Sequence, residues 1–354
     1  MSALGVRERG KRTENFWSIA NFCIPWIVNQ YVRASRRSFL GSKFVPNPPR
    51  RHHYVPEFLL KRWASEDGKV VRFKRVRGDK LHAKRVPFQG IGFQENLYAL
   101  PNMDPKKPIT QVLETHFFSP IDNAGAQCLD TLENATDIPA DKRFRTDWAA
   151  FLLSLSLRGP TAINNLHELA AHLIEEESRE GPIEEKTERI VQENPEFAEA
   201  VRQPIENFNS RLAMASLPML VLPQRVLGRI MGLRWFLGTL EGSARELLLS
   251  DRPVLWTPLE QPNGSIIFPI SPERVFVAAR DQQLFEKFSS ADPKSLSELI
   301  NRGTVGCARE FVVARNEKAK KFIEKAFGKL NGAALADAVT SEVYASWKAT
   351  ASKN

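Results

Sequence analysis

The amino-acid sequence predicts an α+β fold with a small N-terminal β unit, a helical middle and a C-terminal antiparallel sheet flanked by helices. Three features of the sequence support this prediction. Between residues 69 and 100, short runs of β-branched and aromatic residues are separated by glycine turns, a pattern typical of strands. Residues 148–157 are apolar almost all round, which indicates a helix that is buried on most sides. Residues 265–268 and 274–279 are two extended apolar runs joined by a proline-rich turn, as expected for a hairpin.

Length and composition are those of a globular protein. The chain has 354 residues, enough for one large domain or two ordinary ones, and its 42% apolar and 26% charged content argues against disorder. Its cysteines, Cys23, Cys128 and Cys307, are widely separated and form no Cys-x-x-Cys pair, so they predict neither a disulfide framework nor a zinc site. The sequence therefore predicts a protein of a reducing compartment, the cytoplasm, with no metal and no cofactor.

The net charge of +9 is unevenly distributed along the chain. Residues 1–51 carry ten basic against two acidic side chains, and residues 52–90 carry ten against four. Residues 166–206 reverse the sign, with twelve acidic against four basic side chains. A charged face is commonly no more than a solvated surface, but the density of positive charge from Arg50 to Arg85 predicts contact with nucleic acid or another polyanion.

Composition also divides the chain into three parts. Residues 1–49 are predicted to be a basic N-terminal extension, either loosely ordered or the product of a misassigned upstream start, that ends in a proline-rich linker. Its apolar run from Phe16 to Val28 is too short for a transmembrane helix, which needs ~20 apolar residues. A single domain is expected over residues 50–330 and a helix or tail over residues 331–354. Nothing in the sequence indicates an oligomeric state.

The first predicted strands lie between the linker and residue 100. Residues 70–73 and 85–88 have the β-branched and aromatic content of strands, and Gly68 and Gly78 provide turns beside them. A further strand is expected to end near residues 97–100.

The middle of the chain is predicted to be helical. A helix is expected to begin near Thr110 and to resume from Ile121 to Asn134. Asp141 is suited to cap the next helix, which ends where Gly159 and Pro160 break the chain. Residues 183–208 carry only a thin apolar stripe, which predicts an outer helix.

The last third of the chain is predicted to alternate strands and helices. Beside the hairpin, the expected strands are residues 234–239, 247–249, 253–256 and 311–314. The expected helices are residues 296–308 and 317–327, with an appended amphipathic helix at residues 333–347.

The segment from Arg51 to Trp63 is the most informative part of the sequence. Pro56 fixes its own φ and favours extended backbone at the residue before it, so His52 and His53 are expected to be held in place ahead of an apolar segment. Taken alone, the segment is also explained as the opening strand of a domain, with aromatic anchors in the core and histidines as ordinary polar neighbours.

The run His-Tyr-Val-Pro-x-Phe-x-Leu, from His53 to Leu60, resembles the opening signature of the bacterial family known as domain of unknown function 4238. Further segments are similar to motifs of that family in the same order: Glu95-Asn96-Leu97-Tyr98, Leu113-Glu114, Ile121-Asp122, Leu157-Arg158-Gly159-Pro160, Ser250-Asp251-Arg252-Pro253-Val254, Pro269-Ile270-Ser271-Pro272 and a last helix from Asn301. The resemblance covers roughly residues 50–328. Leu155 stands where glutamine is expected and Arg252 where asparagine is usual, so a site lined by these positions would be altered in this chain. The resemblance implies a fold boundary and a set of candidate residues, but no reaction.

Three side chains are predicted to converge in one cleft: His53, Arg158 and Asp251. Each follows a rigid apolar element, and an acid, a base and a permanent cation offset one another's desolvation. Arg158 ends an apolar helix and must find a carboxylate, a carbonyl group or water, because a buried unpaired charge is very costly. In a catalytic site His53 would be a general base or metal ligand, Asp251 would orient it or bind the metal, and Arg158 would stabilise anionic charge. The alternatives are a purely structural polar network and a turn closed by Asp251.

Further residues are predicted to take part in binding around these three. They are His52, Glu57, Arg62, Glu114, Ser250 and Asn301. No two of the six histidines are three or four residues apart, which argues against a metal site on a helix.

Two functions are consistent with the sequence. One is a binding or sensor module for nucleic acid or another phosphate-bearing partner. The other is a phosphodiesterase-like hydrolase that uses the histidine, the aspartate and the arginine. The sequence contains no P-loop, G-x-G-x-x-G, H-E-x-x-H or G-x-S-x-G motif, which favours the binding function.

Overall fold

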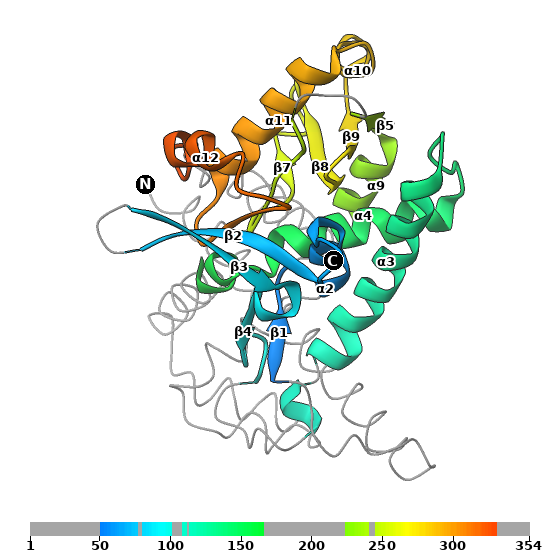
Figure 1. The fold of residues 1–354 in the computed structure, drawn as a ribbon. Helices are drawn as coiled ribbons and strands as arrows, with labels where there is room; N and C mark the ends of the chain where they lie inside the picture. Colours follow the sequence, from blue (N-terminus) through cyan, green and yellow to red (C-terminus); the bar gives the residue numbers. More distant parts are fainter. Residues whose placement is uncertain are drawn as a thin grey trace, which may run out of the picture.

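The computed structural model describes residues 50–76, 80–100, 108–111, 113–165, 224–240 and 245–330. The predicted N-terminal extension, the outer helix at residues 183–208 and the C-terminal helix or tail lie outside these residues. Within them the chain forms helices and antiparallel sheets (Figure 1), so the predicted α+β class is confirmed. No helix in this part of the chain is long and apolar enough to span a membrane.

Strand β1 (Arg51–His53) opens the described chain and pairs antiparallel with β4 (Phe93–Glu95). The prediction that a strand ends near residues 97–100 is wrong, because the chain leaves extended geometry at Asn96. This residue has a φ of 56°, in the left-handed region that asparagine tolerates better than most residues. Residues 97–100 consequently form a turn that lies beside β1.

After β1 the chain forms two short helical segments, α2 (Glu57–Leu60) and the 3-10 helix η1 (Lys61–Trp63). The indole Nε1 of the buried Trp63 donates a hydrogen bond of 2.8 Å to the carbonyl oxygen of Leu247. This bond fixes the opening segment against the C-terminal half of the chain.

The strands β2 (Lys69–Arg75) and β3 (Leu81–Pro87) form a hairpin that reaches beyond the body of the molecule in Figure 1. The hairpin belongs to a four-stranded sheet of order β3-β2-β10-β6, whose other strands are β10 (Val312–Ala314) and β6 (Leu249–Ser250). The small N-terminal β unit is therefore completed by strands from the far end of the chain.

The helical middle begins with a change of helix type. A 3-10 helix, η4 (Pro108–Gln111), is followed by a π-helix, η5 (Glu114–Phe118), and then by α3 (Ser119–Asn134). The backbone N–H of Ser119 donates to the carbonyl oxygen of Glu114, five residues earlier, as in a π-turn. The sequence predicted helix here but not the π-turn.

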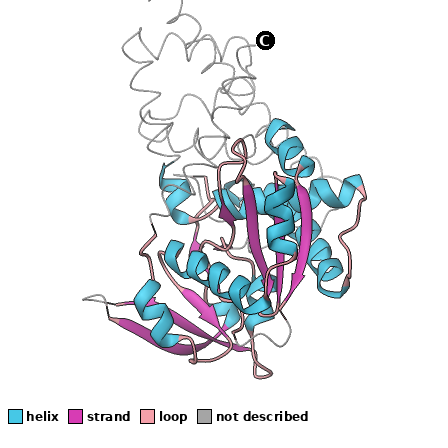
Figure 2. Cartoon of the chain, turned by 90° about the horizontal axis from the view of Figure 1, so that it is seen from above, coloured by secondary structure: helices cyan, strands magenta, loops and turns pink. Residues whose placement is uncertain are grey.

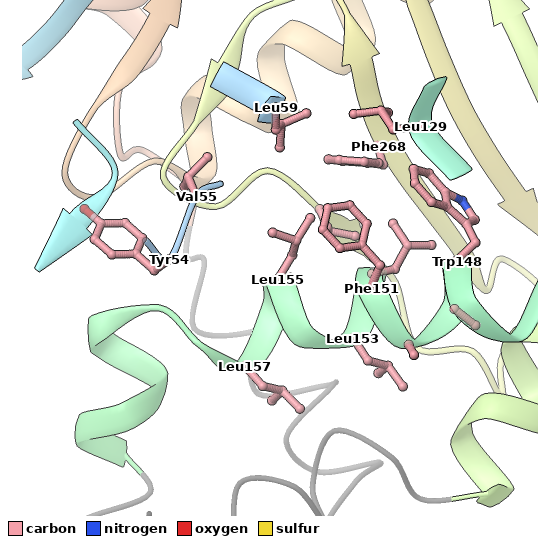
Figure 3. Close-up of a cluster of buried hydrophobic side chains, with 14 of the residues drawn as sticks. Tyr54, Val55, Leu59, Leu129, Trp148, Phe151, Leu153, Leu155, Leu157 and Phe268 are labelled. Carbon is pink, nitrogen blue, oxygen red and sulfur yellow. The ribbon is translucent and has the colours of Figure 1, made fainter. Parts of the chain in front are cut away.

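Helix α4 (Lys142–Leu157) occupies the centre of the largest hydrophobic core. The carboxylate of Asp141 accepts a hydrogen bond of 2.7 Å from the backbone N–H of Phe144, as predicted for an N-cap. Trp148 and Phe151 are fully buried, and their rings lie against Phe268 of the C-terminal sheet (Figure 3).

The C-terminal sheet has the strand order β5-β9-β8-β7. Its strands are β5 (Arg234–Thr239), β9 (Arg274–Ala279), β8 (Ser265–Ser271) and β7 (Leu255–Trp256), and the helices near it are α9 (Gln224–Gly232), α10 (Gln282–Ser289) and α11 (Pro293–Cys307). Helix α12 (Lys320–Ala326) packs instead with β2 and β10 of the other sheet. Phe276 and Ala278 of β9 join the large core around α4, whereas Val275 and Val277 pack with residues of α10 and α11. Helices therefore flank the sheet as predicted (Figure 2).

Candidate functional site

Arg158 follows the last residue of α4 and is completely buried. Its Nη1 donates a hydrogen bond of 2.7 Å to Oδ1 of Asp122, and its Nε donates one of 3.2 Å to the carbonyl oxygen of Tyr54. The arginine thus has both a carboxylate and a carbonyl partner, as its position at the end of an apolar helix required. Its Nη2, however, is buried and has no hydrogen-bond partner among the described residues.

Asp122, in the first turn of α3, is the acid that sequence reasoning did not assign to Arg158. Its side chain is 23% exposed. Burial raises the pKa of this carboxyl group, and the guanidinium of Arg158 opposes that shift. The two residues are 36 positions apart, and the only sequence signal was the position of Asp122 in a motif of the resembling family.

Glu114 begins the π-helix η5, and its Oε2 is buried without a hydrogen-bond partner in the described structure. Burial raises the pKa of this carboxyl group to about 7, with the charge of Asp122 adding to the rise and that of Arg158 opposing it. Near neutral pH this glutamate is therefore present both as an acid and as a carboxylate.

His53 ends strand β1 with a side chain that is 17% exposed. Its Nε2 is 3.4 Å from Oε1 of Glu57 but makes no hydrogen bond with any described residue. Burial is the largest cause that lowers the pKa of His53, and the charge of Arg158 lowers it further. Glu57, a hydrogen bond with the Gln89 backbone and Asp122 act in the opposite direction. The imidazole is therefore mainly neutral at pH 7.

We call His53, Glu114, Asp122 and Arg158 the Arg158 cluster, because each is close enough to another to change its pKa or to bond to it. It combines a neutral base, an acid with a pKa near 7 and a permanent cation. Within the described part of the chain, three of its polar atoms are buried without a hydrogen-bond partner, one each from the base, the acid and the cation.

His52 is linked to this cluster through hydrogen bonds of Tyr98. Its Nδ1 accepts a hydrogen bond of 2.8 Å from the backbone N–H of Tyr98, so its proton is on Nε2, which is 2.6 Å from Oε1 of Gln111. The hydroxyl of Tyr98 in turn donates a hydrogen bond of 2.7 Å to the carbonyl oxygen of Arg158. Both ring nitrogens of His52 are thus engaged within the fold, so the predicted binding role of this residue becomes a positioning role.

Asp251 makes its hydrogen bonds with a different part of the chain from His53 and Arg158. Its carboxylate accepts backbone hydrogen bonds of 3.0 Å from Arg309 and 3.2 Å from Phe311, and it has no hydrogen bond or ion pair with His53 or Arg158. The structure therefore brings two of the three residues together, while Asp251 holds the turn before β10. The sequence left open that Asp251 closes a turn through its own carboxylate. In the structure the carboxylate bonds to the backbone of another turn, at residues 309–311. A catalytic role for Asp251 stays a prediction.

The other predicted binding residues, apart from Glu57 and Glu114, are engaged within the fold. Asn301 makes two hydrogen bonds to the backbone of the segment before β6. Its Oδ1 accepts from the N–H of Leu248, and its Nδ2 donates to the carbonyl oxygen of Glu246. Ser250 bonds to the backbone of the residue two positions later, and Arg62 makes ion pairs of 2.6 Å with two acids of α3.

No group of three or more histidine, cysteine, aspartate or glutamate side chains is arranged to hold a metal ion in the described part of the chain.

A family model described as "Protein of unknown function (DUF4238)" matches residues 51–318, which is more than half of the chain. No curated protein and no solved structure matches the chain. The matched residues include every member of the Arg158 cluster.

Proposed function

The chain belongs to the DUF4238 family of proteins of unknown function, and we propose that this member binds a small phosphate-bearing ligand at the Arg158 cluster. The observation that carries the proposal is the buried and unpaired Nη2 of Arg158. A donor left in this state costs on the order of 1–3 kcal/mol, which a ligand oxygen would recover. A guanidinium group that keeps one free edge is also well suited to phosphate oxygens.

The charges of the cluster indicate which interactions would hold a ligand there. The charge of Arg158 is already offset by Asp122, so a ligand would be held mainly by hydrogen bonds. The free donors would be Nη2 of Arg158, the carboxyl group of Glu114 when protonated, and His53 when it takes up a proton. Several donors within one cluster would suit a group with several acceptor oxygens, and phosphate is such a group.

The opposite pKa shifts of His53 and Glu114 favour a second candidate function, the phosphodiesterase-like hydrolase. A water molecule would transfer a proton to Nε2 of His53 as its oxygen attacks phosphorus. The bond from phosphorus to the leaving oxygen would break, and Glu114 would supply the proton that this oxygen needs. Arg158 would stabilise the negative charge that builds up on the phosphoryl oxygens.

Calorimetric titration with inorganic phosphate and adenosine monophosphate at pH 6.5 tests the binding proposal. Arg158→Lys keeps the charge but loses the planar fork, and Glu114→Ala removes a donor, so each should weaken binding at least ~10-fold. The matched control is Arg145→Lys within α4, because the hydrogen bonds of Arg145 to described residues go to the carbonyl oxygens of Met231 and Leu233. Equal affinity in all four proteins, or no binding by the wild type, would overturn the proposal.

Turnover of bis(4-nitrophenyl) phosphate tests the hydrolase candidate. His53→Gln should lower the rate by ~100-fold or more, the usual range for loss of a general base, while phosphate binding persists. A wild-type protein that binds phosphate but does not cleave this ester would reject the hydrolase and keep the binding function.

We also propose that part of the basic segment from Arg50 to Arg85 contacts nucleic acid as a larger phosphate-bearing partner. The support is the density of positive charge in this segment. A cytoplasmic location belongs to the same proposal, because Cys128 and Cys307 are free and buried thiols of the kind found in reducing compartments. Fractionation of cells that express the tagged protein would test the location.

A further inference from the structure

The β2–β3 hairpin has two faces with different surroundings. Because directly paired residues of antiparallel strands share a face, Val71, Phe73 and Leu81 lie on one face, where they pack in a core with residues of α12. The opposite face carries Arg72 and Lys74 of β2 and His82 and Lys84 of β3. We call these four residues the basic face of the hairpin. All are exposed except Arg72, which is half-buried.

The basic face contains like charges that are directly opposite each other. Arg72 pairs with Lys84 across the two strands, and neither has an ion pair with a carboxylate among the described residues. Like charges in this arrangement destabilise a sheet. The Nε of Arg72 is in addition buried without a hydrogen-bond partner in the described structure. The like-charge pair would be relieved by an anion that binds between Arg72 and Lys84 on the exposed side of the hairpin.

The neighbouring basic residues are, in contrast, neutralised by acids of the chain. On the opposite face of the same strands, Lys69 and Arg85 form ion pairs with Asp67, the latter at 2.7 Å. Lys74, at the edge of the basic face, is 3.4 Å from Glu310. Arg72 and Lys84 thus form a directly opposed pair of cations with no ion pair to an acid among the described residues.

We propose that the basic face docks the phosphodiester backbone of double-stranded DNA, with one phosphate bridging Arg72 and Lys84. This inference rests on the proposed nucleic-acid partner. It adds which surface of the protein binds the nucleic acid and that the nucleic acid is double-stranded. A two-stranded ribbon that projects from the body has the dimensions to approach a duplex groove (Figure 1). The basic face carries no phenylalanine, tyrosine or tryptophan on which unpaired bases could stack, which favours the duplex over a single strand. Contacts to phosphates alone carry no base sequence, so binding is independent of sequence.

Fluorescence anisotropy with a labelled 20-base-pair duplex tests the proposal on the full chain. The variant Arg72→Gln with Lys84→Gln removes two charges from the basic face. Its matched control, Lys69→Gln with Arg85→Gln, removes two charges from the same strands on the other face. We expect the first double variant to bind at least ~10-fold more weakly at 0.1 M salt and to lose about 0.9 from the slope of log K against log salt, the value for one lost phosphate contact. The control should stay within about twofold of the wild type.

Three results would overturn the inference: no duplex binding by the wild type, equal losses in both double variants, or binding to vesicles of anionic lipid without binding to DNA. Tighter binding of a single strand than of the duplex would also contradict it. The Arg158 cluster is intact in both double variants, so adenosine monophosphate binding measured in parallel separates a failure of this surface from a failure of the buried site.

Discussion

At the scale of single residues, the pair formed by Arg158 and Asp122 has the largest expected effect on stability. Asp122→Asn leaves a completely buried guanidinium without its carboxylate, so we expect the free energy of unfolding to fall by about 3 kcal/mol. Urea denaturation monitored by tryptophan fluorescence measures this change.

Asp130→Asn is the matched control, because Asp130 also pairs with an arginine, Arg62, but its side chain is 79% exposed. For this exposed pair, the free energy of unfolding should fall by less than about 1 kcal/mol. Equal losses for the two variants would show that the burial of Arg158 does not determine the energy of its ion pair.

Glu114 makes stability depend on pH in the direction opposite to most carboxylates. Its pKa rises from 4.5 to about 7 on folding. Between these values the folded chain holds more protons than the unfolded chain, so the free energy of unfolding falls as the pH rises through this window. The full loss is on the order of 3 kcal/mol.

Glu114→Gln should remove this dependence and make the protein more stable than the wild type at pH 8. Urea denaturation at pH 5, 6, 7 and 8 measures both proteins, with Glu324→Gln on the exposed side of α12 as the control. A wild-type profile that is unchanged by Glu114→Gln would contradict the raised pKa.

The sequence pointed to some contacts of this cluster and not to others, for reasons that concern individual residues. Arg158 was identified because an arginine at the end of an apolar helix needs a partner, but local sequence cannot choose among distant acids. His52 and His53 are adjacent in a strand and therefore point to opposite sides, so one supports the cluster and the other belongs to it. Asp251 was assigned to the site because it ends a strand, yet the same position lets it bond to backbone N–H groups nearby.

At the scale of elements, the β2–β3 hairpin has one face that packs in a hydrophobic core and stabilises the fold. On its other face the like charges of Arg72 and Lys84 destabilise the sheet. Lys84→Glu places a carboxylate opposite Arg72, so the melting temperature should rise, by an amount that corresponds to ~0.2–1 kcal/mol, while duplex binding weakens. Differential scanning calorimetry and the anisotropy assay measure the two effects.

Lys80→Glu is the control for this change of charge, because Lys80 precedes β3 and lies outside the paired residues of the two strands. It should leave the melting temperature nearly unchanged. A lower melting temperature for Lys84→Glu would mean that Arg72 and Lys84 do not repel each other in the folded protein.

Elements with a strong local signal were predicted well, and elements whose geometry depends on one residue were not. The cap at Asp141, the apolar helix after it and the hairpin of β8 and β9 follow from short-range patterns. The π-turn at Glu114 has no pattern of its own, and the left-handed turn at Asn96 replaced an expected strand.

At the scale of the whole molecule, one core joins residues from both ends of the described chain. Val55 and Trp63, near its start, and Phe311 and Val313, near its end, belong to the same hydrophobic cluster around α4. The sequence predicted the α+β class from the types of elements, but strand pairing between β2 and β10 depends on contacts between distant residues. Such partners cannot be chosen from local periodicity.

The π-turn at the start of η5 has a consequence for how this site arises and disappears in evolution. A π-turn holds one residue more than the α-helical turn it replaces, and each residue of an α-helix advances the chain by ~100°. Deletion of a single codon between Glu114 and Phe118 would close the turn as ordinary α-helix and rotate Glu114 away from Arg158. An insertion or deletion in this turn can therefore remove the acid from the cluster even where Glu114 itself is kept.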